Sequence, residues 1–220
     1  MKAVARVRCA LFAAAAFLVV VFAAVGFAQE PAEHYFTFNV GTGFTPMVGR
    51  ISTSLNNGYN VGIGAGYRFS SHFELNGQFG WHGLGVNSGL IAEAGARGAD
   101  AHIWSVTADP MIRLGGARRF DPYFVGGVGY YRRVVNFTAP SIVPTLFFDP
   151  FFGGIFPGFV PARTILSTIS QSGIGGSLGF GFHIRVSESG LKIFVESRYH
   201  YAATGSVPTR MIPLTIGFRW

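Results

Sequence analysis

The sequence of 220 residues is rich in apolar side chains and poor in charge: 49% of the residues are hydrophobic, 15% are aromatic and 12% are charged. About half the usual share of charged residues leaves a water-facing surface difficult to build, so the composition favours a protein that faces lipid. The formal charge of +7 is too mild a basic excess to indicate a nucleic-acid partner.

Residues 1–28 have the pattern of a secretory signal peptide. Three basic residues precede an apolar run over residues 9–25, and Gly26-Phe27-Ala28 is a small-x-small cleavage site. An uncleaved anchor is the alternative, but the apolar run is short for a bilayer span. Cleavage after Ala28 removes three of the 17 basic residues and the only cysteine, Cys9. The mature domain, residues 29–220, would then carry a formal charge of +4 and no disulfide.

Eight later segments alternate apolar residues with polar residues or glycine, the period-two pattern of β-strands with two different faces. In residues 120–133 both faces mix aromatics with glycine, and the facing stays unassigned. We expect a bulge at Pro110, because proline cannot donate to the ladder. The predicted strands are residues 35–44, 59–69, 72–82, 102–114, 120–133, 175–186, 191–202 and 210–220.

The last of these strands predicts how the sheet closes. Its apolar face runs to the final residue and consists of Ile212, Leu214, Ile216, Phe218 and Trp220. A strand of this kind at a chain end would fray unless both of its edges were paired. A closed antiparallel barrel is the architecture that pairs every edge.

The connections between the strands alternate in length. Residues 47–58, 83–100 and 134–171 form long connections, and very short turns separate the strands between them. Bacterial outer-membrane barrels have an even strand number, short periplasmic turns and long external loops, and strands of about ten residues suffice to cross a bilayer at a tilt. Residues 134–171 contain five prolines and no sustained periodicity, which predicts an irregular loop.

Alternation alone does not say which face of the barrel is outside, because a soluble lipocalin-like barrel shows the same periodicity with its apolar face inside. The polar face decides, since glycines suit the crowded interior of a narrow barrel and would weaken strands exposed to water. We therefore predict an all-β, eight-stranded antiparallel up-and-down transmembrane β-barrel with Arg–Glu and Arg–Asp contacts in its lumen and no wide channel. The predicted polar network of the lumen is Arg68, Glu74, Asp109, Arg113, Arg185, Lys192, Glu196 and Arg198.

Four stretches resemble a known family: YNVGIGAGYRF at 59–69, FDPYFVGGVGYY at 120–131, FVESRYHY at 194–201 and LTIGFRW at 214–220. They are similar to the small outer-membrane β-barrels of the OmpA-like transmembrane, OmpX-like and opacity-protein group, over residues 35–220. The resemblance implies a location in the bacterial outer membrane, surrounded by its lipid. It also implies that Phe218 and Trp220 belong to a C-terminal signal read by the barrel-assembly machinery.

Catalytic chemistry finds little support in the sequence. The segment around His200 is similar to a strand of the lipid A deacylase barrels that carries His-x-Ser-Asn, but here Ala202 and Ala203 stand in place of the serine and asparagine. Without a hydroxyl at that spacing there is no nucleophile. The six histidines show no metal-ligand spacing, and the glycine repeats lie in strands, not in phosphate-binding loops. We predict no catalytic residue, no cofactor and no metal.

The third long connection is the best candidate for an interaction site. It contains a run of phenylalanines that would expose apolar surface to a partner, lipid headgroups or a hydrophobic ligand, unless it folds back to cap the barrel rim. We predict a non-enzymatic envelope-structural or surface-adhesion protein. A narrow pore or hydrophobic-solute passage is the alternative, and a lipid-modifying barrel enzyme comes third. The interaction candidates are Phe147, Phe148, Phe151, Phe152, Phe156 and Phe159.

Overall fold

A computed structural model describes residues 35–115, 120–186 and 190–220. The predicted signal peptide and residues 29–34, 116–119 and 187–189 lie outside these ranges. In the described part, no helix has the length and apolar character needed to cross a membrane. The strands are β1 Tyr35–Thr45, β2 Leu55–Arg68, β3 Phe73–Val86, β4 Gly98–Arg113, β5 Phe120–Asp149, β6 Gly154–Arg185, β7 Lys192–Ala202, β8 Thr209–Met211 and β9 Leu214–Arg219, with two short helices, η1 Gly49–Thr53 and α2 Ser88–Glu93.

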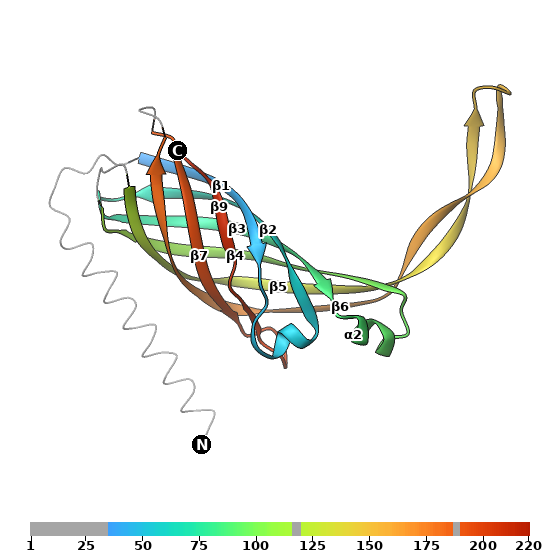
Figure 1. Ribbon diagram of the computed structural model, residues 1–220, viewed down its shortest axis with the longest axis horizontal. Helices are drawn as coiled ribbons and strands as arrows, with labels where there is room; N and C mark the ends of the chain where they lie inside the picture. The colour runs from blue at the N-terminus through green and yellow to red at the C-terminus, as the bar shows by residue number, and fades with distance from the viewer. Residues whose placement is uncertain (1–34, 116–119, 187–189) are drawn as a thin grey trace, which may run out of the picture.

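The strands form a closed antiparallel ring (Figure 1). Each strand from β1 to β7 pairs with the next, and β9 pairs with both β7 and β1, so the eight-stranded barrel is confirmed. The terminal strand is paired at both edges, as predicted, and the backbone of Trp220 bonds that of Phe38. It is not continuous, however: β8 and β9 are separated at Ile212-Pro213, where proline interrupts the ladder.

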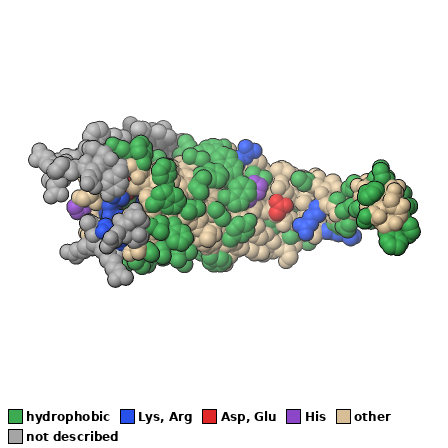
Figure 2. Space-filling model, turned by 90° about the horizontal axis from the view of Figure 1, so that it is seen from above, with side chains coloured by type: hydrophobic (Ala, Val, Ile, Leu, Met, Phe, Trp, Pro, Cys, Tyr) green, Lys and Arg blue, Asp and Glu red, His purple; other side chains and the backbone are tan. Residues whose placement is uncertain are grey.

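The predicted facing of the strands is confirmed. The apolar face points outward, with Phe36 71% exposed and Ile63 56% exposed, whereas Glu74 and Asp109 are fully buried in the lumen. Figure 2 shows hydrophobic side chains covering the side of the barrel. β5 follows the same rule: its odd-numbered residues up to 137 point inward, and Phe120, Phe124 and other even-numbered residues point outward.

Two sequence predictions about β4 and its neighbours need correction. The bulge at Pro110 is absent: β3 pairs through it at Leu75, and the β4–β5 pairing skips Asp109 and Pro110 and resumes in the same register. A missing donor removes ladder bonds without requiring an extra residue. The long connections are also shorter than predicted, because β2 begins at Leu55, β3 continues to Val86 and β4 begins at Gly98.

The largest difference concerns residues 134–171, which form an extended hairpin and not an irregular loop. β5 and β6 stay paired from the barrel out to Asp149 and Gly154. Their outer neighbours end at the pairs Gly98–Thr138 and Gly175–Ala202, and a register shift after Phe137 marks the point of departure. We call residues 139–149 and 154–164, with the turn between them, the β5–β6 ribbon. It projects away from the barrel and does not cap the rim (Figure 1).

Candidate functional site

The lumen at the end with the short turns is organised around the buried carboxylate of Glu74. Thr37 Oγ1 donates a hydrogen bond to Glu74 Oε1 over 2.5 Å, and the guanidinium of Arg219 contacts the same oxygen. Arg68 Nε lies 3.8 Å from Glu74 Oε2. β1, β2, β3 and β9 are therefore joined through one carboxylate, which ties the first strands to the last.

A second ionic group lies deeper in the lumen. The guanidinium of Arg198 bridges two carboxylates, Asp109, 2.7 Å from its NH1 nitrogen, and Glu196, which contacts Nε. Thr107 donates to Asp109 over 2.7 Å, and the hydroxyl of Tyr123 donates to Glu196 over 2.9 Å. All these groups are buried, so the two carboxylates depend on Arg198 for their compensating charge.

A third pair joins Arg113 and Asp121, whose Nε and Oδ2 atoms lie 2.6 Å apart, with His183 Nδ1 3.8 Å from the same carboxylate. Six of the predicted lumen residues thus lie together inside the barrel. Arg185 does not: it ends β6 and is exposed, which corrects the prediction. Lys192, opposite Arg185 on β7, is half-buried.

Several lumen residues were not in the predicted network, notably Asp121, Tyr123 and Arg219. Asp121 and Tyr123 lie on the strand whose facing the sequence left open. Arg219 lies between Phe218 and Trp220, which belong to the outward apolar face of the last strand. The alternation of that strand therefore already placed Arg219 on the inward face. Glycines make room for these side chains: a Cβ at Gly66 would lie 2.6 Å from Glu74 Oε1 and 2.7 Å from Thr37 Oγ1.

Above the ionic groups, two histidines lie with their rings 6.3 Å apart. His82 Nδ1 is 3.0 Å from Thr45 Oγ1, and His200 Nδ1 is 2.9 Å from the hydroxyl of Tyr131. The cavity that both histidines line measures about 30 Å³, enough for a water molecule but not for an acyl chain or a sugar. No group of three metal-ligating side chains occurs within the described ranges.

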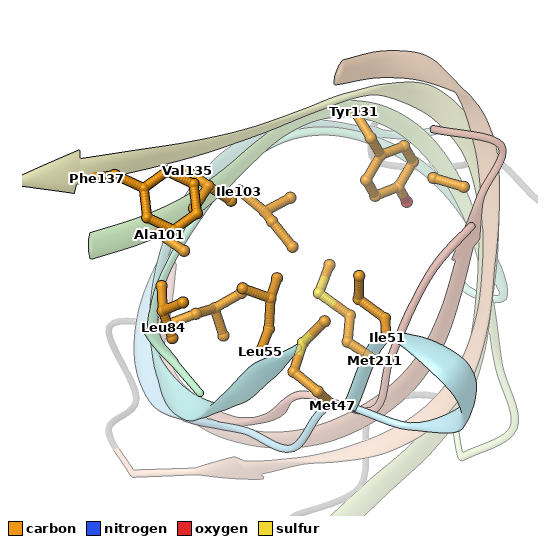
Figure 3. Packing of buried hydrophobic residues seen from close by; sticks show 12 residues of the cluster. Met47, Ile51, Leu55, Leu84, Ala101, Ile103, Tyr131, Val135, Phe137 and Met211 are labelled. Atoms are coloured by element: carbon orange, nitrogen blue, oxygen red, sulfur yellow. The ribbon is translucent and has the colours of Figure 1, made fainter. Parts of the chain in front are cut away.

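Many of the buried side chains in the lumen at the long-loop end are apolar, although Arg133 and Thr209 are buried at the same level. The sequence did not predict this apolar group. Helix η1 turns inward so that Ile51 is buried, and Met211 from β8, which is bridged to Met47 just before η1, lies beside it (Figure 3). These residues pack together inside the barrel above the histidines, and we call this group the apolar plug. Its members are Met47, Ile51, Leu55, Leu84, Val86, Ala101, Ile103, Tyr131, Val135, Phe137, Ala202 and Met211.

The β5–β6 ribbon carries the predicted interaction candidates to the point farthest from the barrel. All six phenylalanines are exposed, and Phe151 and Phe152 in the turn reach 89% and 72% exposure. The backbone N–H groups of these two residues bond Asp149 Oδ1 at 2.8 and 3.3 Å, which fixes the turn. Figure 2 shows this second cluster of hydrophobic side chains at the far end of the ribbon.

The model of the outer membrane protein β-barrel domain family matches residues 13–219. The chain belongs to this family. A search of curated proteins found no match. Family members lie in the bacterial outer membrane, so this is where the barrel resides.

Solved structures share the fold of this outer-membrane barrel. Neisserial surface protein A is 16% identical, with a TM-score of 0.55 over 84% of this chain and 97% of its own. A major outer membrane protein from Thermus thermophilus is 12% identical, with a TM-score of 0.57 over 86% and 98%. Ail from Yersinia pestis is 14% identical, with a TM-score of 0.46 over 84% and 99%. The first two structures, at identities this low, indicate a shared fold only, and the similarity to Ail is too weak to add to that.

Aromatic residues form a belt near each end of the outer-membrane barrel, as expected at the two lipid–water boundaries. Phe38 and Trp220 lie 6.4 Å apart near the short turns, and Trp104 and Tyr130 lie 5.5 Å apart near the long loops. Phe218 and Trp220 both point outward. Their role as an assembly signal stays a prediction. In this class the short turns face the periplasm and the long loops face the outside, and the β5–β6 ribbon lies at the long-loop end of the barrel.

Proposed function

We propose that this outer-membrane barrel is a non-enzymatic surface-attachment protein, in which the barrel is a rigid mount and the β5–β6 ribbon makes the contact. The observation that carries the proposal is the ribbon itself. Unbroken pairing out to Asp149 and Gly154 holds an apolar turn away from the cell surface. An apolar surface of this size, kept in water at the end of a stiff arm, supports a role in interaction.

The contents of the lumen support attachment over transport. Three buried ionic groups and the apolar plug lie along the lumen, and the cavity beside the two histidines measures only about 30 Å³. Moving a solute through would require breaking buried ion pairs, each of which is costly to separate. The lumen also supports a non-enzymatic role, since His200 faces the hydroxyl of Tyr131 and the buried methyl group of Ala202 lies where a nucleophile would be needed.

The test compares bacteria that display the full chain with bacteria that display a ribbon-deleted chain, in which an Asn-Gly turn joins Thr138 to Ile165. Both should give the heat-dependent gel shift of a folded barrel in the outer-membrane fraction. Attachment is then measured on phospholipid-coated, protein-coated and bare beads. We expect the full chain to increase attachment to at least one surface and the deletion to abolish the increase. Equal attachment by both chains on every surface would refute the proposal.

An envelope-structural role is the second candidate, and the ribbon-deleted chain distinguishes it from attachment. The lumen network joins the first and last strands, which favours a very stable barrel irrespective of its loops. A strain lacking the protein would then become sensitive to detergent, and the ribbon-deleted chain would restore resistance as well as the full chain does. Under the attachment proposal, the ribbon-deleted chain would not restore the attachment of the cells to the beads.

A further inference from the structure

The prolines of the β5–β6 ribbon follow a regular pattern. In the paired strands, Pro140 faces Arg163 and Pro144 faces Phe159 on one side, and Pro157 faces Leu146 and Pro161 faces Ile142 on the other. All four therefore belong to the same alternating class of residue pairs. Residues of an antiparallel ladder either exchange hydrogen bonds with their partner or direct their N–H and C=O groups away from it. Since proline has no N–H, this class is the one that directs its groups outward.

The pattern has a direct effect on the edges of the ribbon. Beyond Thr138 and Gly175 neither strand has an outer neighbour, so its outward N–H groups would be open to pairing with another chain. Along each edge, every second outward position is a proline: 140 and 144 in β5, 157 and 161 in β6. A partner strand would lose every second hydrogen bond that the N–H groups of the ribbon edge would donate. Strand addition, by another protein or by a second copy, is therefore disfavoured.

The same absence of donors suits a lipid environment, where an unsatisfied N–H group costs more than in water. The side chains of the ribbon also suit a lipid environment. Phe148, Ile155 and Phe159 share the face of the prolines, with exposures of 66% to 74%, and Phe151 and Phe152 extend this surface around the turn. The charged residues of 139–164 are Asp149, whose carboxylate caps the turn, and Arg163, near the barrel end of the ribbon. The tip thus offers apolar contact without a cation for an acidic partner.

The reach of the ribbon decides which lipid surface it meets. Residues 139–149 extend past the last pairing partner in β4 and span roughly 35 Å at the usual rise of a strand. The aromatic belt at Trp104 and Tyr130 lies farther back still. The hydrocarbon around the barrel is therefore out of reach of an outstretched ribbon.

We propose that the tip of the β5–β6 ribbon inserts shallowly into a phospholipid bilayer other than the one that holds the barrel. The inserting side chains are those of the turn, Phe151 and Phe152, followed by Phe148, Ile155 and Phe159. Apolar side chains enter the boundary between headgroups and acyl chains, while the paired backbone of the ribbon keeps its own hydrogen bonds. The inference rests on the proposed attachment function and names its partner.

The experiment uses the full chain folded in lipid nanodiscs and separate vesicles of zwitterionic phosphatidylcholine. Association is measured by flotation. We expect the unmodified protein to float with the vesicles and the Phe151→Ser/Phe152→Ser variant to lose about 100-fold in affinity, roughly tenfold per phenylalanine. The matched control, Ile165→Ser/Ile169→Ser, removes two exposed apolar side chains near the barrel and should change affinity less than threefold. High salt should not weaken binding, because no ion pair is involved.

A second readout places the tip inside the bilayer. The fluorescence of the tryptophan introduced by Phe152→Trp should be quenched when vesicles of brominated phosphatidylcholine are added. Trp81, Trp104 and Trp220 of the unmodified protein, which contact the nanodisc lipid, report any lipid exchange and should not be quenched.

Four results would overturn the proposal: no flotation of the unmodified protein, equal binding by the tip variant, loss of binding at high salt, or pairing of nanodiscs through their tips without vesicles. The last would identify a second copy as the occupant. If the ribbon-dependent attachment of cells persisted in any of these cases, the attachment function would stand and only its lipid partner would be wrong.

Discussion

Replacing Arg198 with methionine should remove much of the stability of the barrel. Among the described residues, Arg198 forms ion pairs with both Asp109 and Glu196, and both carboxylates are buried in the lumen. Methionine fills a similar volume but leaves two uncompensated carboxylates. Breaking a buried ionic group by removing one partner costs about 3–5 kcal/mol. The free energy of unfolding of Arg198→Met should therefore fall by about this amount.

The assay is urea unfolding of the protein in lipid vesicles, followed by tryptophan fluorescence and checked by the heat-dependent gel shift. Arg185→Met is the matched control, because Arg185 is exposed, and its effect should stay within about 0.5 kcal/mol. The triple variant Asp109→Asn/Glu196→Gln/Arg198→Met should recover most of the loss, since it removes the charges together. A loss below about 1 kcal/mol for Arg198→Met, or no recovery in the triple variant, would refute the reasoning.

Three further outcomes are expected. Gly66→Ala should destabilise the barrel by about 1–3 kcal/mol in the same urea assay, because its methyl group meets the carboxylate of Glu74, whereas Gly77→Ala, with one atom at 3.7 Å, should change little. Phe218→Ser/Trp220→Ser should reduce the folded barrel in the outer-membrane fraction severalfold while refolding in pure lipid slows less, if these residues are read during assembly. In planar bilayers the unmodified protein should give no steady channel openings, because buried ion pairs and packed apolar side chains occupy the lumen; regular openings would contradict this.

Period-two alternation was sufficient to predict the barrel strands, because one face meets lipid and the other a packed polar lumen. In β5 the pattern was ambiguous, since glycine and aromatic residues occur on both faces. Arg132 is exposed while Arg133 is buried, so charge did not mark one face either. Asp121 shares the parity of Arg133, and the exposed Phe120 has the opposite parity. Only the register with β4 and β6 settles the facing.

The apolar plug escaped prediction because the rule of a polar interior was applied along the whole strand. The inward row of β3 changes from Glu74 and Asn76 near the short turns to Leu84 and Val86 at the other end. Where lipid ends, the outer surface meets water and becomes polar, as shown by the exposed hydrogen bond from Asn136 to Asp100. The apolar residues at that level turn inward for the same reason that they point outward within the bilayer: they face away from water.

The ribbon was mistaken for an irregular loop because prolines usually interrupt a sheet. That expectation holds for a strand with neighbours on both sides, where every N–H is needed. In a two-stranded ribbon, half of the N–H groups point outward and bond no strand, so prolines at those positions cost no ladder bond. Pro140 and Pro144, and likewise Pro157 and Pro161, lie four positions apart, and this even spacing directs the missing N–H of both prolines to the same edge. With Gly153 in the left-handed conformation at the turn, this spacing is the pattern of a hairpin whose edges resist further pairing.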